Sequence, residues 1–326
     1  MSAPPFRAEH IGSLLRPPRL LQDRSLADEC IAEAIRWQES LGLEVVTDGE
    51  FRRESWRLGF VSKVAGFARA EAWGNVDLQR DDAGNVMRVG EAPVAVTRVR
   101  RTGPFVADEV AFSLNRAGQS ASTATSTPIS SNSSTTWCGF IGMRSRPCTP
   151  PAAAISRSTR WRRRCCAIRS CATRCARAAT IRAVRERPAG MTVGVHMCRG
   201  NAMGKWIAEG GYERIAEKSF SRMEVDAFCL EFDSERAGGF EPLRFVPRGK
   251  RVVLGLLSTK IPALEGKDDL KRKIAAAARF VPLENLSISP QCGFASHEKG
   301  AALGFEHQEA KLRRVVETAA EVWGHA

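Results

Sequence analysis

The sequence has no apolar run approaching the roughly 20 residues that a membrane-spanning helix needs. Its N-terminus also lacks the apolar centre of a secretory signal. No Gly-x-Gly-x-x-Gly turn and no phosphate-binding loop is evident, so a common nucleotide-binding fold is not indicated. We therefore expect a cytoplasmic protein without a membrane partner, and we expect its cysteines to be mostly reduced.

Lysine and acidic residues are missing from one long segment, residues 113–185. This segment contains 13 Arg and six of the ten Cys. It carries the whole net charge of +13, because the other 36 Lys and Arg are matched by 36 Asp and Glu. A charge of this size is typical of nucleic-acid-binding proteins, but here it is confined to one aberrant stretch.

Two halves of the segment differ in composition. Residues 120–136 (SASTATSTPISSNSSTT) are nearly all Ser and Thr and indicate a disordered linker. Residues 157–180 (RSTRWRRRCCAIRSCATRCARAAT) are rich in Arg and Cys and have neither helical nor strand periodicity. Their Cys spacing does not indicate zinc, because no regular Cys-x-x-Cys pair or nearby His accompanies it. An Arg-rich arm that binds nucleic acid is one interpretation.

A reading-frame error is the interpretation that we favour for this segment. Codons compatible with residues 155–182, read from their third base, can encode Gln-Ile-Asp-Glu opposite residues 156–160, followed by a charged helical stretch. That product has ordinary protein patterning, whereas the printed segment does not, and natural sequences are usually locally consistent. We therefore expect one domain over residues 1–326, in which residues 113–185 replace barrel elements and are irregular or disordered.

Outside this segment, short apolar runs alternate with amphipathic stretches. Gly42 is the expected C-cap of the first helix. The predicted helices cover residues 26–42, 210–223, 267–280 and 307–323, and the predicted strands cover residues 43–51, 191–201, 225–233, 251–260 and 286–294. This alternation predicts an α/β fold with a parallel sheet, and the number of units favours a (β/α)8 TIM barrel.

Polar residues gather where the predicted strands end, which is where barrel enzymes carry their chemistry. His196, Cys198, Glu231 and Cys292 each follow or end such a strand. Zinc takes N, S and O ligands of these kinds in tetrahedral geometry, and thiolates favour zinc over magnesium or calcium. The plainer interpretation is that they are core residues, as Cys229 is expected to be, and spacing alone does not exclude it.

Several long motifs occur in order along the chain. They are FRAEHIGSLLRP (6–17), TDGEFRRESW (47–56), HMCRGN (196–201), FCLEFDSERAGGFEPL (228–243) and ISPQCGF (288–294). Together they resemble the cobalamin-independent methionine synthase family, in its single-barrel form that matches the catalytic C-terminal barrel. The resemblance covers about residues 5–112 and 186–324.

The resemblance implies a catalytic Zn²⁺ held by His196, Cys198, Glu231 and Cys292. It also implies that Ile11, Gly12 and Ser13 hold homocysteine and that Glu50 binds its amino group. Zinc would deprotonate the thiol, whose ordinary pKa is about 8.5, so that the sulfur attacks a methyl carbon. Methyltetrahydrofolate or another methyl donor would supply that carbon.

The chain departs from the family at one strand. The family carries a stretch close to Leu-Gln-Ile-Asp-Glu, whose Asp binds substrate, and the printed sequence lacks it whereas the shifted frame restores it. We therefore expect the chain as written to fold poorly or to be inactive. Two other functions stay open: zinc-dependent alkyl transfer to another thiol such as coenzyme M, and nucleic-acid binding through the Arg-rich segment.

Overall fold

The computed structural model describes most of the N-terminal and C-terminal thirds of the chain and only short pieces between them. The described residues are 6–53, 64–70, 77–80, 86–88, 92–102, 112–113, 116, 192–202, 204–206, 209–295 and 303–326. Of the segment 113–185, only Ser113 and Arg116 are among them, so its predicted disorder, reading-frame error and nucleic-acid binding lie outside the described residues.

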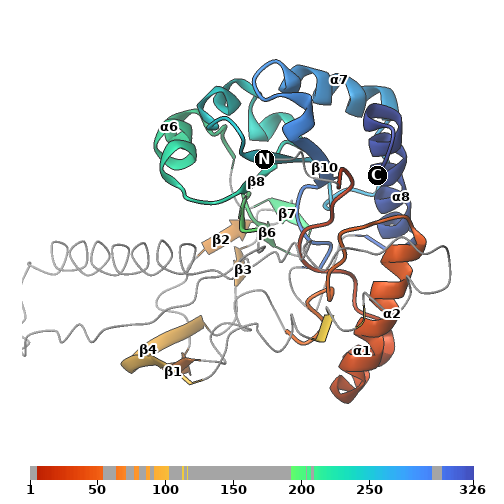
Figure 1. The fold of residues 1–326 in the computed structure, drawn as a ribbon. Helices are drawn as coiled ribbons and strands as arrows, with labels where there is room; N and C mark the ends of the chain where they lie inside the picture. Colours follow the sequence, from red (N-terminus) through yellow and green to blue (C-terminus); the bar gives the residue numbers. More distant parts are fainter. Residues whose placement is uncertain are drawn as a thin grey trace, which may run out of the picture.

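A parallel sheet lies at the centre of the molecule (Figure 1). Its four strands follow the order β10-β9-β8-β5, and each adjacent pair is parallel. The strands are β5 (Gly194–Met197), β8 (Ala227–Glu231), β9 (Arg251–Leu257) and β10 (Leu286–Pro290). Because successive strands lie side by side and run in one direction, their carboxyl ends meet at one edge.

The N-terminal segment extends this sheet beyond β10. Ala8 forms a parallel bridge with Ile288. The Glu9 amide donates to the Ile288 carbonyl at 2.9 Å, and the Ile288 amide donates to the Arg7 carbonyl at 2.9 Å. Residues from the two ends of the chain are therefore neighbours, as the first and last strands of a closed barrel must be.

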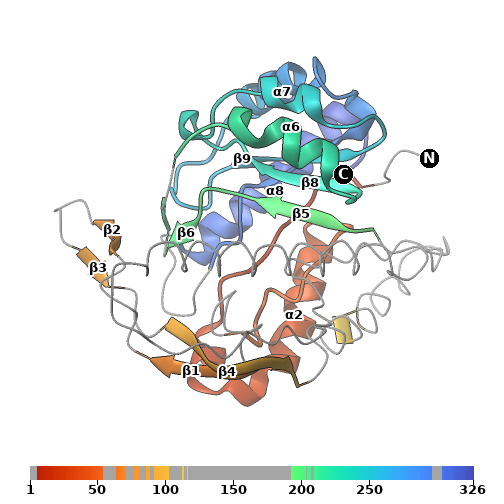
Figure 2. The ribbon, with the colours of Figure 1, turned by 90° about the vertical axis from the view of Figure 1, so that its left-hand side faces the viewer.

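Helices cover the outer side of the strands (Figure 2). Helix α6 (Glu213–Arg222) precedes β8, α7 (Lys267–Ala278) precedes β10, and α8 (Phe305–Trp323) follows it. The N-terminal region forms α1 (Pro18–Gln22), η1 (Arg24–Leu26) and α2 (Ala27–Ser40). Only short 3-10 turns, η2 (Glu235–Ala237) and η3 (Glu241–Phe245), connect β8 to β9, and η4 (Leu283–Asn285) precedes β10. The four predicted helices are confirmed, and Gly42 has the left-handed φ of 91° expected of a C-cap.

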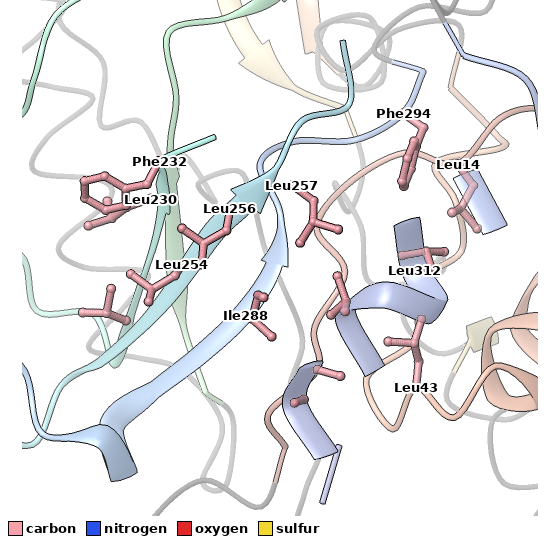
Figure 3. Close-up of a cluster of buried hydrophobic side chains, with 14 of the residues drawn as sticks. Leu14, Leu43, Leu230, Phe232, Leu254, Leu256, Leu257, Ile288, Phe294 and Leu312 are labelled. Atoms are coloured by element: carbon pink, nitrogen blue, oxygen red, sulfur yellow. The ribbon is translucent and has the colours of Figure 1, made fainter. Parts of the chain in front are cut away.

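Alternate residues of the strands face two different layers. Leu254 and Leu256 of β9 are fully buried in the large core beneath the helices, where Leu312 of α8 also lies (Figure 3). Val253 instead forms a separate small cluster with Cys229 and Ile11. Since successive side chains of a strand point to opposite faces, this cluster marks the inner face of the sheet. Cys229 is therefore the core residue that the sequence predicted.

Antiparallel strands add a feature that the sequence analysis did not predict. Strand β1 (Val64–Ala70) pairs with β4 (Ala92–Arg101), and β2 (Asp77–Arg80) pairs with β3 (Val86–Arg88). A third small pair joins β6 (Asn201–Ala202) to β7 (Lys205–Trp206). Alternating Val residues in β4 are the signal that could have indicated a strand there.

The predicted strand at residues 43–51 is wrong. The structure has turns and bends there, although Leu43 and Val45 are buried as the apolar pattern required. The side chain of Gln38 takes the role of a neighbouring strand: its Oε1 accepts from the Thr47 amide at 3.0 Å and its Nε2 donates to the Thr47 carbonyl at 2.8 Å. The apolar pattern therefore predicted that Leu43 and Val45 are buried. It could not predict that the backbone of Thr47 bonds to the Gln38 side chain instead of a neighbouring strand.

None of the helices in the described part of the chain is long and apolar enough to cross a membrane.

Candidate metal centre

Three side chains from two strand ends form one compact cluster. His196 is in β5, Cys198 follows that strand directly, and Cys292 lies two residues after β10. One potential ligand atom from each lies within 4.8 Å of the other two. His196 pairs across the ladder with Cys229, which places it in the row of residues on the inner face. The fold thus brings together residues that are far apart in the sequence.

Cys198 and Cys292 shift each other's pKa in opposite directions. A hydrogen bond from the Cys292 thiol lowers the pKa of Cys198 to about 3, and His196 lowers it further against the opposing effect of burial. The same hydrogen bond, together with burial, raises the pKa of Cys292 well above its usual range. The Gly200 amide also donates to the Cys198 sulfur at 3.4 Å. One sulfur is therefore poised as a thiolate, the form that binds metal ions.

His196 supports a metal at this cluster. Both of its ring nitrogens are buried and lack a hydrogen-bond partner among the described residues. A buried polar atom without a partner is costly, and such atoms often point to a missing ion or water. An imidazole and two cysteines match the preferred ligands of zinc, so the residues present fit the ion that the sequence predicted.

Glu231, the fourth predicted ligand, is the last residue of β8 but is not part of the three-residue cluster. Its Oε1 lies 3.3 Å from Nζ of Lys260, and its Oε2 accepts a hydrogen bond from the Arg199 amide. Burial raises the pKa of Glu231, while the charge of Lys260 lowers it. The carboxylate is thus near the strand ends but is turned toward a cation.

Lys260 was not identified as a functional residue from the sequence. Its side chain is fully buried, and its Nζ also lies 3.6 Å from a carboxylate oxygen of Asp233. The sequence did offer one signal, because Lys260 is the last residue of the predicted strand 251–260. Functional side chains of a barrel lie at such strand ends, and a lysine is rarely buried there without a partner. Its positive charge also lowers the pKa of Cys292, so it acts on the metal cluster as well as on Glu231.

The predicted substrate loop, Ile11 to Ser13, packs directly against the Cys292 segment. Gly12 has a φ of 84°, and a Cβ there would lie 3.3 Å from the Gly293 nitrogen. The Ser13 carbonyl accepts from the Phe294 amide at 2.7 Å, and its hydroxyl accepts from the Ala295 amide at 3.2 Å. Ile11 itself is buried in the inner cluster. The predicted substrate loop therefore packs against the segment that directly follows Cys292.

Glu50 lies on the other side of the same loop. The Leu14 amide donates to the Gly49 carbonyl at 3.1 Å, and the Thr47 hydroxyl donates to the Gly12 carbonyl at 3.3 Å. Glu50 is the only non-glycine residue with a positive φ, 57°, among the described residues. Its carboxylate pairs with Arg53 at 3.2 Å. Such backbone strain is a common mark of functional sites.

The strand ends, the cluster and the adjoining loops define a class of protein: an α/β barrel with a His/Cys cluster that could hold a metal ion at the carboxyl end of its sheet. Comparison with known proteins agrees. Residues 191–321 match the family described as the catalytic domain of cobalamin-independent synthase. The YxjG protein of Bacillus subtilis is 34% identical over 368 aligned positions, which cover 98% of this chain and 95% of that protein.

Two solved structures share the fold. One is a vitamin-B12-independent methionine synthase from Listeria monocytogenes, with a TM-score of 0.54 and 23% identity over 100% of both chains. The other is a B12-independent methionine synthase from Shewanella sp. W3-18-1, solved with selenomethionine, with a TM-score of 0.60 and 15% identity over 99% of this chain and 95% of that one. The predicted TIM barrel is thereby confirmed. The chain belongs to the cobalamin-independent methionine synthase family, whose members are methyltransferases.

Proposed function

We propose that this protein transfers a methyl group to the thiol of homocysteine and so forms methionine. The observation that carries the proposal is the cluster of His196, Cys198 and Cys292 at the carboxyl ends of the barrel strands. Membership of the methionine synthase family supports the same reaction. The Shewanella structure was solved with selenomethionine, an amino acid of the same class as the proposed product.

Zinc is the metal that the donor set favours, with His196, Cys198 and Cys292 as its ligands and Glu231 as the predicted fourth. When bound, it lowers the pKa of a coordinated thiol and yields a nucleophilic thiolate at neutral pH. With three or four protein ligands, a bound zinc would need to keep or open one position for the substrate sulfur. The Cys292 thiol and His196 lower the pKa of Cys198 and so favour the deprotonated sulfur that binds a metal ion.

Substrate binding is assigned to the two loops beside the cluster. The Glu50 carboxylate binds the ammonium group of homocysteine, and Gly12 and Ser13, with Ile11 buried beneath them, hold the rest of the amino acid. This arrangement favours an amino-acid thiol over coenzyme M, which has no amino group. The methyl donor is methyltetrahydrofolate or another compound with an electrophilic methyl group.

Metal content tests the assigned ligands. We expect about one zinc per chain in the purified protein and loss of that zinc in a Cys292→Ser variant, because a hydroxyl is a far weaker ligand than a thiolate. Cys30→Ser is the matched control, since Cys30 is a buried free cysteine of α2 outside the cluster. Metal analysis by mass spectrometry gives the answer, and unchanged zinc in Cys292→Ser would reject the assignment.

A further inference from the structure

We infer that Arg16 is a positioning residue that fixes the Glu50 carboxylate relative to the Cys292 segment. This inference rests on the proposed function, in which Glu50 binds the amino group of the substrate while its sulfur is held at the metal cluster. Arg16 itself is 5% exposed, and its guanidinium donates to three backbone carbonyls of the described residues. Its role would be to keep the two ends of the substrate site at a constant separation.

The backbone conformation of Glu50 needs support from its surroundings. Its φ of 57° is a conformation that residues with a side chain rarely adopt and keep only when their surroundings hold it. The structure holds both of its backbone polar groups. The Glu50 amide donates to Oδ1 of Asp48 at 2.9 Å, and the Glu50 carbonyl accepts from Nη2 of Arg16 at 3.1 Å. Arg16 therefore stabilises the strained peptide that aims the carboxylate.

Arg16 donates to three backbone carbonyls from two segments that are distant in the sequence. Besides the Glu50 carbonyl, its Nη2 donates to the Arg53 carbonyl at 2.7 Å. Its Nη1 donates to the Ala295 carbonyl at 3.2 Å, although Ala295 is 279 residues away in the sequence. Ala295 lies three residues after Cys292, and its amide is held by Ser13. One guanidinium thus joins the Glu50 turn to the segment that carries a predicted metal ligand.

Arg16 also binds the backbone of Arg53, the ion-pair partner of the Glu50 carboxylate. Arg53 pairs with that carboxylate at 3.2 Å, and Arg16 holds the backbone carbonyl of the same Arg53. Arg16 therefore acts on Glu50 directly and through Arg53. A planar fork with several donors suits this task, whereas the single ammonium of lysine cannot reach two opposed segments at once. We therefore expect Arg16→Lys to behave as a loss of function, not as a conservative change.

The experiment compares two thiols that differ in one group. L-homocysteine carries the amino group that Glu50 would bind, and 4-mercaptobutanoate lacks it. Isothermal titration of each thiol into zinc-loaded full-length protein gives the ratio of the two dissociation constants. We expect wild type to prefer homocysteine by tenfold or more, and we expect Arg16→Met and Arg16→Lys to reduce this preference at least tenfold without changing zinc content.

Controls separate positioning from general damage. Arg19→Met removes an ion-paired arginine of α1 that is 42% exposed and should leave the preference unchanged. If Arg16→Met does not fold, Arg16→Lys decides the question alone. Equal weakening of both thiols, or a preference within threefold of wild type, overturns the inference. A wild-type protein without any preference rejects the role of Glu50 in the proposed function itself, and the inference falls with it.

Discussion

Buried charged groups lie beside the cluster of His196, Cys198 and Cys292, and each is stabilised by an oppositely charged neighbour. Lys260 is enclosed with the carboxylates of Glu231 and Asp233, so neither acid is left as an isolated charge. An unpaired buried charge would cost several kcal/mol. The motifs could indicate Glu231 as a metal ligand, but they could not indicate Lys260 as its ion-pair partner, because that pairing depends on where two strands end in space.

His10 gives a pH-dependent prediction at the residue scale. Burial lowers the pKa of His10 from 6.5 to about 4. As the pH falls from 6.5 to 4, the unfolded chain binds a proton at His10 that the folded protein does not, so the free energy of unfolding decreases. The contribution of this residue is about 3 kcal/mol at most.

The measurement is urea unfolding at several pH values between 7 and 4. We expect His10→Gln to lose less stability over this range than wild type does, whatever its stability at pH 7. A His10→Gln slope equal to that of wild type would contradict the prediction.

At the scale of elements, the site depends on two loops that approach more closely than side chains allow. A Cβ on Gly293 would lie 2.4 Å from both the amide nitrogen and the hydroxyl of Ser13. Only a glycine permits this approach, and it lets the Gly12–Ser13 turn share hydrogen bonds with the segment after Cys292. The close approach aligns the predicted substrate loop with the predicted metal cluster.

Gly293→Ala should force these loops apart. We expect the free energy of unfolding to fall by about 2 kcal/mol, as overpacking commonly costs, and zinc retention to fall because Cys292 is the adjacent residue. Gly266→Ala is the control, since a Cβ there meets nothing within 4 Å. Chemical denaturation and metal analysis report the two effects, and a Gly293→Ala protein as stable as the control would show that the loops can separate freely.

At the scale of the whole molecule, barrel closure is the deciding requirement. The described sheet joins β5, β8, β9 and β10 to the N-terminal segment at Ala8. The sequence predicts further barrel strands in residues 113–185, but the composition of that segment is not that of barrel strands. A barrel that lacks strands leaves open edges and cannot bury its interior.

The reading-frame interpretation therefore predicts a difference between two chains. The chain as written should melt less sharply and at a lower temperature than a chain in which residues 113–185 are translated in the shifted frame. Circular dichroism during heating provides the comparison. Soluble expression of the chain as written with one sharp transition would count against the interpretation.

The sequence by itself determined the α/β alternation, four helices, the approximate positions of four parallel strands and the residues of the candidate metal cluster. It could do so because helical and strand periodicity, caps and long motifs are local patterns. It did not determine the state of residues 43–51, where Gln38 replaces a neighbouring strand, or the antiparallel strands of residues 64–101.

Only the tertiary structure decided which groups meet. It placed His196, Cys198 and Cys292 in one cluster, gave Glu231 a buried lysine as its partner and joined Glu50 to the Cys292 segment through Arg16. These contacts connect residues separated by tens to hundreds of positions, and their distances follow from how strands, turns and buried charges pack together. A linear pattern carries no information about such distances, whereas the packing of the parallel sheet against its helices and loops fixes them.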